Sequence, residues 1–279
     1  MKGFLSAFGA ACRNKTFLAG FVIMLSVCFT AVFADVIAPF TYDEIDISNR
    51  LKPPSTQHLL GTDHLGRDSF SRLVYGSQIA LKVGFIAVSI QILVGVSLGL
   101  IAGYFGGWQD RAIIFITDVF WAVPTIILAI AICTVLGPSL TNVIIAIAIV
   151  SWAQFTRIVR SKTQALKNMA YVEAARAFGE NDLNIIMRYI LPNVFPVIIV
   201  LASLALPVAI IDTTAMGFLG LGAQPPAPDW GVILSGSMTY IREAPWIGIF
   251  PGLAIIYIVL GFNLLGEGLR DILDPRLKI

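Results

Sequence analysis

Two carboxylates stand inside long apolar runs of this sequence and are the first candidates for chemistry. Asp118 lies in the first third of one run, and Asp212 lies near the end of another, followed by Thr213 and Thr214. A charged side chain within a membrane helix is costly and usually faces the interior of the bundle. Each carboxylate could therefore line a polar path and meet a substrate's amino group or a cation. Alternatively, each could pair with a basic or hydroxyl neighbour and hold helices together.

The sequence offers little sign of catalysis or nucleotide binding. It contains no HExxH, no recognisable pair of nucleophile and base, and no Walker-type GxxxxGK[ST] motif. The three cysteines, Cys12, Cys28 and Cys133, have neither CxxC nor metal-ligand spacing and are expected to be small apolar residues. We therefore expect no enzyme, and no cofactor, metal or nucleotide bound by this chain.

Composition indicates what kind of protein positions these carboxylates. Of the 279 residues, 57% are hydrophobic and only 13% are charged, and the mean hydropathy is +0.83. Soluble domains average about 25% charged residues, so half that share at this length favours a polytopic membrane protein. The net charge of +2 gives no indication of a nucleic-acid partner.

Six apolar segments are long enough to cross a bilayer, because a spanning helix needs about 20 mostly apolar residues. Helices are expected because each satisfies its own backbone hydrogen bonds in lipid. The sequence therefore predicts an all-α membrane protein with six transmembrane helices. The segments are residues 17–38, 79–104, 112–135, 139–160, 194–216 and 246–268.

Lysine and arginine predict the orientation of these segments. With a cytoplasmic N-terminus, thirteen of the nineteen basic residues fall in or beside cytoplasmic segments. The outside segments hold Arg50, Lys52, Arg67, Arg72, Lys82 and Arg242. Both termini and the charged stretch 161–193 are therefore expected in the cytoplasm. The first segment, ending in Val32-Phe33-Ala34, resembles a signal peptide with a cleavage site, but its length favours a retained anchor.

Residues 39–78 are expected to form an irregular outside loop, because Pro53-Pro54 and many Asn, Asp and Gly residues interrupt it. Its part Gly61–Arg72 could end in a short helix lying on the membrane surface. His58 and His64 lie in this loop. Imidazole suits nickel, but there is no third ligand, so we expect both histidines to be ordinary surface residues.

Glycine and proline indicate where the spans pack and bend. A glycine at every fourth position of the second span predicts close helix packing; these are Gly95, Gly99, Gly103 and Gly107. Proline bends a helix and could mark hinges or cavity walls, or simply packing, at Pro124, Pro207 and Pro251. Glycines and prolines exclude a regular helix across much of residues 217–246, which we expect to form an outer rim or gate of a pathway.

The charged stretch Tyr171–Asn193 is unusual between two apolar runs. Lys162–Arg176 has helix-forming residues with apolar positions at helical spacing. Gly179 interrupts that pattern, and Asn181-Asp182 offers an N-cap for a second short helix that Pro192 ends. A jointed segment of this kind, leading directly into a span, predicts a docking element that transmits force from a partner. A solvated connector is the alternative.

This stretch resembles the EAA loop of ABC-importer permeases, which reads EAA, three residues, G, nine residues, an apolar residue or often His, one more residue, then LP. The matching positions are Glu173, Ala174, Ala175, Gly179, Leu191 and Pro192. Tyr189 departs from the usual Ile or His and could shift partner preference. The stretches Gly61–Leu73, Phe218–Gly231 and Phe262–Lys278 also resemble the C-type permease subunit of dipeptide, oligopeptide and nickel importers.

The resemblance implies the type I ABC importer permease fold in a bacterial inner membrane. It implies four partners: a homologous second permease, two ABC ATPase subunits that bind ATP and magnesium, and an extracytoplasmic substrate-binding protein. The expected division is an anchor and outside loop (residues 1–78), a transmembrane domain (79–270) with its coupling loop (161–193), and a cytoplasmic tail (271–279).

The implied function is ATP-driven import by alternating access, in which the coupling loop lies in a groove of an ATPase. Di- or oligopeptides are the first choice of substrate. Nickel or a nickel chelate is the alternative, because those permeases share stretches like Asn142–Ala148. A secondary transporter without ATPases is disfavoured, because a proton relay needs several deep carboxylates. A membrane enzyme is disfavoured by the missing catalytic motifs.

Overall fold

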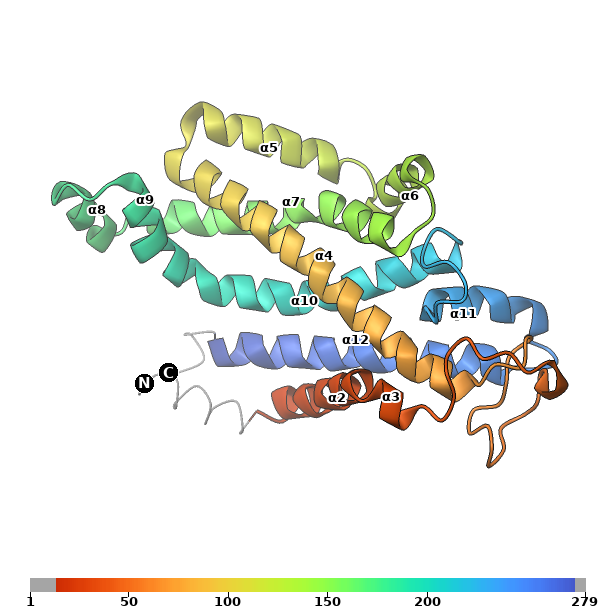
Figure 1. Ribbon diagram of the computed structural model, residues 1–279. Coiled ribbons are helices and arrows are strands. Elements are labelled where there is room, and N and C mark those ends of the chain that lie inside the picture. Colours follow the sequence, from red (N-terminus) through yellow and green to blue (C-terminus); the bar gives the residue numbers. More distant parts are fainter. Residues whose placement is uncertain (1–13, 274–279) are drawn as a thin grey trace.

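The computed structural model describes residues 14–273, which form helices joined by loops (Figure 1). The expectations for Lys2, Cys12, Arg13 and the tail beyond Leu273 lie outside the described residues. The longer helices are α2 (Lys15–Val32), α4 (Ser69–Phe105), α5 (Gly107–Trp121), α6 (Thr125–Leu136), α7 (Leu140–Leu166), α10 (Leu191–Phe218) and α12 (Trp246–Leu273). The shorter ones are α3 (Ala34–Ile37), α8 (Ala170–Ala177), α9 (Asp182–Ile185) and α11 (Trp230–Ser237).

The six-span prediction is confirmed in number, with one span broken. In the described residues, five helical segments are long and apolar enough to cross a membrane, and α5 with α6 makes a sixth if the pair is counted as one span. The axes of α5 and α6 differ by 86°. The break falls at Ala122–Pro124, because proline has no N–H to donate and its ring clashes with the preceding turn. The continuous helix expected over 112–135 is therefore wrong.

The second span begins earlier than the expected residue 79. Its helix, α4, starts at Ser69, and the Asp68 carboxylate caps it by accepting a hydrogen bond from the Ser71 N–H at 2.7 Å. Such a cap satisfies a donor that the first turn would leave unpaired. The short surface helix expected at the end of Gly61–Arg72 is therefore wrong, because those residues lead directly into a spanning helix.

The glycine stripe lets α4 pack closely on α7, as predicted. A Cβ atom built on Gly99 would lie 2.9 Å from the Thr156 carbonyl oxygen, and one built on Gly95 would lie 2.6 Å from the Trp152 carbonyl oxygen. Gly103 lies as close to the α7 backbone at Arg160. Gly107 is the exception, because it starts α5 with a φ of +58° and nothing within 4 Å.

Gly95, Ser97 and Gly99 also have the GxSxG spacing of a hydrolase nucleophile. That motif requires a strand, a sharp turn and a helix. Here it lies inside α4, and the Ser97 hydroxyl donates to the Leu93 carbonyl oxygen at 2.7 Å. The spacing is therefore part of the packing stripe.

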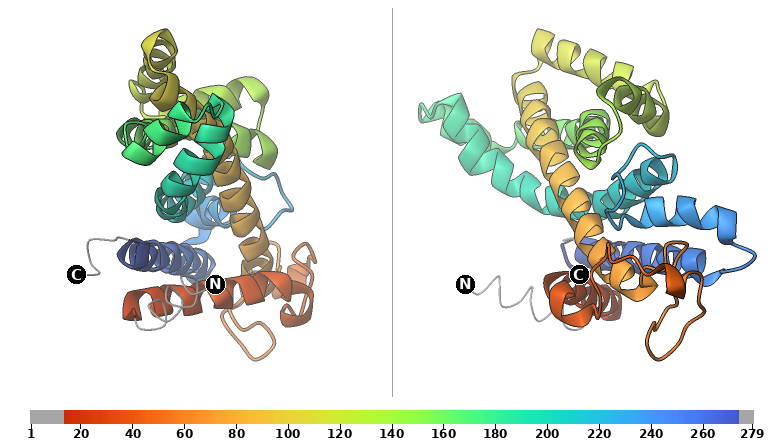
Figure 2. Two further views of the ribbon diagram at one scale, coloured as in Figure 1. Left: turned by 90° about the vertical axis from the view of Figure 1, so that its left-hand side faces the viewer. Right: turned by 45° about the vertical axis from the view of Figure 1, so that its right-hand side comes forward.

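The helical bundle has two ends of different structure, and α4 crosses its centre (Figures 1 and 2). At one end lie α8, α9, the start of α2 and the end of α12, where the Asn14 amide donates to Asp271 at 3.3 Å. At the other end lie residues 38–68 and α11. Between these ends, α2 packs along α12, and a Cβ built on Gly20 would clash with the α12 backbone at Leu265.

Candidate functional site

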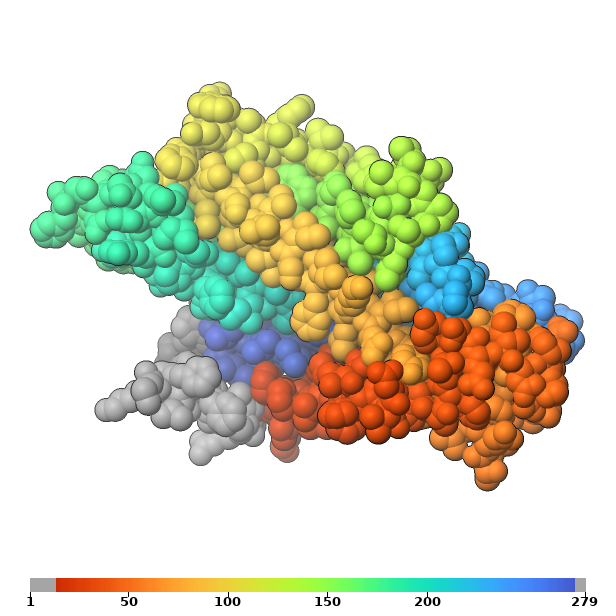
Figure 3. Space-filling view, in the orientation of Figure 1, coloured from red at the N-terminus to blue at the C-terminus, as the bar shows by residue number. Residues whose placement is uncertain are grey.

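The charged segment between α7 and α10 projects from one end of the molecule (Figure 3). Its helix α8 buries Val172 and Ala175 against the protein. The opposite side carries Glu173 and Ala174, which are exposed, and the helix ends at Phe178, which is 89% exposed. Leu183 and Met187, which follow in the same projecting segment, are also exposed, at 69% and 52%. Several exposed apolar side chains on one projecting segment suit contact with another protein.

A glycine turn ends α8 as predicted. Gly179 has a φ of +82°, which L side chains rarely adopt. The Gly179 N–H donates to the Arg176 carbonyl at 3.0 Å, and the Glu180 N–H donates to the Ala175 carbonyl at 3.1 Å. These two bonds form a Schellman motif, which satisfies the last carbonyls of the helix. The Asn181 side chain then caps α9 by accepting from the Asn184 N–H at 2.8 Å.

The expected end of the second helix at Pro192 is wrong. Helix α9 continues through a π-helical segment, Ile186–Ile190, into α10, so the helical path runs from Asp182 to Phe218. Leu191 and Pro192 are the first residues of α10, and the Leu191 N–H donates to the Ile186 carbonyl of the π-helical segment. Tyr189 lies half-buried within the π-helical segment.

The predicted helix over Lys162–Arg176 is likewise corrected. The α7 helix ends at Leu166 and α8 begins at Ala170, with non-helical Met169 between them. The projecting segment is therefore connected to one spanning helix at each end, through a short break on the α7 side and without a break on the α10 side.

Asp118 is paired with a basic residue on the neighbouring helix. Its carboxylate forms an ion pair with Arg157 of α7, and the Arg157 guanidinium lies 4.0 Å from the centre of the Trp121 ring. One turn further along α7, Arg160 pairs with Asp110 of α5, to which its second guanidinium nitrogen donates at 2.6 Å. This arrangement corresponds to the alternative in which Asp118 joins two helices.

Asp212 is placed differently, because it lines a cavity of about 90 Å³. The cavity is bounded by α4, the α5–α6 break, α7 and α10. Its polar lining consists of Gln91, Thr125, Ser151, Gln154 and Asp212. The structure thus separates the two predicted carboxylates, since one is ion-paired and the other faces a polar cavity.

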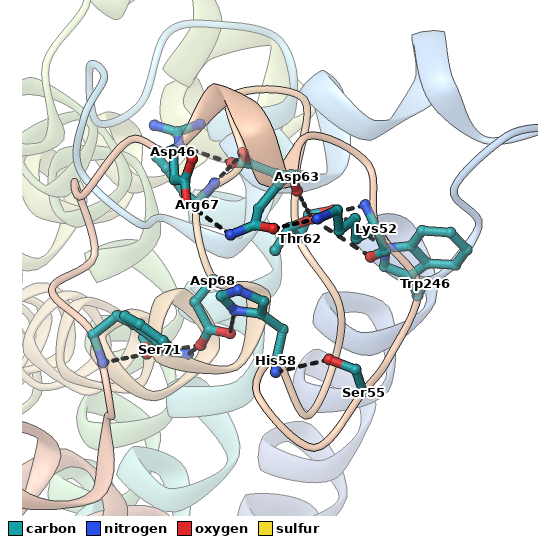
Figure 4. Close-up of polar contacts among 12 residues, drawn as sticks. Asp46, Lys52, Ser55, His58, Thr62, Asp63, Arg67, Asp68, Ser71 and Trp246 are labelled. Atoms are coloured by element: carbon teal, nitrogen blue, oxygen red, sulfur yellow. Dashed lines mark hydrogen bonds and ion pairs between the residues drawn. The ribbon is translucent and has the colours of Figure 1, made fainter.

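The outer loop is far more ordered than expected (Figure 4). His58 is 5% exposed and its Nδ1 lies 2.9 Å from the Asp68 carboxylate, so the prediction of a surface histidine is wrong for His58. Buried Asp63 pairs with Arg67 at 2.7 Å. The Trp246 indole donates to the Thr62 carbonyl at 3.2 Å, which fastens the loop to the start of α12.

This network of loop contacts could not be predicted from the sequence, because its partners are close in sequence but have no periodic spacing. The available signal was the density of charge in Gly61–Arg72, which exceeds what a solvated loop needs. His64 stacks on Tyr240, with ring centres 5.4 Å apart, and burial lowers the pKa of its imidazole. Within residues 14–273, no group of three or more His, Cys, Asp or Glu side chains is placed to hold a metal ion.

Two family models match the chain. Residues 95–279 match the binding-protein-dependent transport system inner membrane component, and residues 7–54 match the N-terminal TM domain of oligopeptide transport permease C. The two matches lie at opposite ends of the chain and do not overlap.

Two curated relatives align with this chain over most of its length and most of their own. A dipeptide transport system permease protein from Alkalihalophilus pseudofirmus is 48% identical over 98% of this chain and 90% of its own. A glutathione transport system permease protein from Pectobacterium atrosepticum is 44% identical over 93% of this chain and 86% of its own. An inward-facing structure of the MetNI methionine ABC transporter has the same fold, with a TM-score of 0.58 and 20% identity over 73% of this chain and 97% of that one.

Proposed function

The chain belongs to the family of binding-protein-dependent transport system inner membrane components, and from this premise we propose that it carries di- or oligopeptides across the membrane. Members of this family are multi-pass proteins of the bacterial inner membrane. The chain is the translocation component of an ABC importer and not an enzyme. The family works with an ATPase and a binding protein.

The finer assembly is part of the proposal. This chain pairs with a homologous second permease above two ATPase subunits, which bind ATP and magnesium. The N-terminus and the segment 161–193 face the cytoplasm, and the first helix is a retained anchor. The common position of α8, α9, the start of α2 and the end of α12 supports this orientation, because all would lie on one side of the membrane.

The observation that carries the proposal is the continuity of the projecting segment with α10. We propose that Glu173, Ala174, Ala175, Gly179, Leu191 and Pro192 form the coupling element, with Phe178 at its tip. A push on that tip reaches α10 through an unbroken helical path from Asp182 to Phe218. When the ATPases close around ATP, the two coupling elements move together, and the spans rock to open the path toward the binding protein.

The test is a charge reversal on the exposed side of α8. Glu173→Lys alters a side chain that faces away from the protein, so folding should be preserved. The complex purified with this variant should lose substrate-stimulated ATPase activity and uptake, or lose its ATPase subunits. Lys162→Glu, another exposed charge reversal on the same segment, is the control. Wild-type ATPase stimulation and uptake in Glu173→Lys would contradict the coupling assignment.

Peptide is preferred to nickel on two grounds. The relatives named above carry dipeptide and glutathione in their names. In addition, His58 is occupied by Asp68 and His64 is stacked on Tyr240, so neither belongs to a ligand set. Uptake should be measured in proteoliposomes with a labelled dipeptide and with radioactive nickel. Dipeptide uptake supports the proposal, whereas uptake of nickel alone would favour the alternative.

We further propose that Asp212 lines the translocation path. Its cavity lies beside the middle of α4 and α7, at Gln91 and Gln154, and near the end of α10. We propose that Asp118, which is ion-paired with Arg157, also lies along this path.

A further inference from the structure

The cavity at Asp212 has features that a packing defect would lack. It lies where the α5–α6 break brings Trp121 and Thr125 against α4, α7 and α10. A purely structural gap between membrane helices would be lined by apolar side chains. Here two amides, two hydroxyls and one carboxylate line it, namely Gln91, Gln154, Thr125, Ser151 and Asp212.

The polar groups of this cavity are unused by the protein. Gln91 is 2% exposed, yet within residues 14–273 its amide has no hydrogen-bond partner. The same part of the chain provides Asp212 with neither an ion pair nor a hydrogen bond. Both groups line the cavity, so they are available to a ligand that enters it. An unpaired amide and an unpaired carboxylate facing one cavity therefore point to a ligand that supplies donors.

The charge around the cavity favours a cation. Arg157 of α7 does not line the cavity; its guanidinium stacks on the ring of Trp121, which does, and is neutralised by Asp118. Asp212 is thus the one charged side chain that lines the cavity. The first residue of α6, Thr125, also lies there. The start of a helix carries partial positive charge, which suits a carbonyl oxygen placed next to the cation.

The volume limits how much of a ligand can enter. The cavity of about 90 Å³ is smaller than the engineered cavity of about 150 Å³ that holds one benzene molecule. An ammonium group with its neighbouring carbon and carbonyl fits that space, whereas a whole peptide does not. Trp121 and Gln154 are exposed, so the cavity is open on one side and the remainder of a longer molecule can extend outward.

We propose that this cavity binds the amino-terminal end of a peptide in transit. The Asp212 carboxylate and the Gln91 amide oxygen accept hydrogen bonds from the α-ammonium group, and the start of α6 faces the first peptide carbonyl. This inference rests on the proposed peptide transport. It adds a requirement of the permease itself for a free amino terminus, separate from any selection by the binding protein.

The test uses the complete permease–ATPase complex in nanodiscs without its binding protein. Saturation-transfer NMR suits the weak binding expected in a path, and the probes are dialanine and N-acetyl-dialanine. Wild type should bind dialanine, and acetylation should weaken binding about tenfold or more, as expected for loss of a charge-assisted contact. Asp212→Asn should bind dialanine as weakly as wild type binds the acetylated probe. Glu267→Gln, at an exposed carboxylate of α12 outside the cavity, should behave as wild type.

Equal binding of both probes by wild type, or unchanged dialanine binding by Asp212→Asn, would overturn the inference. If Asp212→Asn fails to assemble, the two-probe comparison on wild type still decides. Uptake by the wild-type complex with its binding protein is measured in parallel. Absence of dialanine uptake there would instead refute peptide transport, so the two failures are distinguishable.

Discussion

The Tyr104 hydroxyl, at the end of α4, donates a 2.6 Å hydrogen bond to the Asp182 carboxylate at the start of α9. These residues are 78 positions apart in the sequence. Arg176 of α8 lies over the same tyrosine ring, 5.9 Å from its centre. The proposed coupling element is therefore attached laterally to the central helix as well as along the chain, and we expect α4 to move with it.

Removing this lateral attachment should weaken coupling without preventing folding. Tyr104→Phe deletes the hydroxyl and costs about 1 kcal/mol, because Asp182 is exposed and regains water. We expect more ATP hydrolysed per peptide transported in proteoliposomes. Tyr257→Phe is the matched control, because it removes a tyrosine hydroxyl that lies 3.0 Å from the Ser26 hydroxyl, away from the proposed coupling element, and it should leave the ratio unchanged. An unchanged ratio in Tyr104→Phe would show that α4 takes no part in coupling.

The turn at Gly179 should be sensitive to backbone conformation and insensitive to size. A Cβ there meets nothing within 4 Å, so the cost of Gly179→Val comes from its φ of +82°, roughly 1–2 kcal/mol. Asparagine tolerates this region better. Gly179→Val should therefore lower substrate-stimulated ATPase activity more than Gly179→Asn. If both variants lose activity equally, the requirement is for the small side chain itself.

The contact between α4 and α7 should not accept a larger residue. At Gly99 a Cβ would lie 2.8 Å from the Cβ of Val159, so Gly99→Leu forces the helices apart at a cost of about 1–3 kcal/mol. The thermal midpoint of the detergent-solubilised complex should fall. Gly252→Ala, inside α12 with open space around it, is the control and should leave the midpoint nearly unchanged. An unchanged midpoint in Gly99→Leu would contradict the packing described above.

The outer loop should lose stability in acid through His64. Burial lowers its pKa in the folded state, while the unfolded chain has the usual value of about 6.5. Unfolding then takes up a proton below that value, so stability falls as the pH drops through about 6.5. The thermal midpoint of wild type should decrease more between about pH 7.5 and pH 5.5 than that of His64→Gln. An equal decrease would mean that other groups carry the acid sensitivity.

The prolines illustrate what the sequence could and could not predict about the fold. Pro124, Pro207 and Pro251 all occur in apolar runs. Pro207 and Pro251 lie within continuous helices, whereas Pro124 stands at a break of 86°. The local cost of proline in a helix is about 3 kcal/mol and is similar at each position. Tertiary packing decides whether the helix continues, and packing cannot be read from one sequence.

The coupling element was the more predictable of the two candidate sites. Gly179 and the Asn181 cap act through their own backbone neighbours, and both occur as expected. The cavity at Asp212 depends on Gln91 and Gln154, which come from two other helices. The burial of His58 was not predictable for a different reason: its partner Asp68 is only ten residues away, but the irregular loop that joins them has no periodic pattern.

ATP-driven peptide transport by an assembled complex can be tested in proteoliposomes. Proteoliposomes containing the two permeases, the ATPases and the binding protein are given labelled dipeptide, with ATP supplied only on the ATPase side. We predict uptake that requires ATP hydrolysis, and none in liposomes that contain this chain alone. Dipeptide uptake by the chain alone, or uptake by the complex without ATP, would contradict the account.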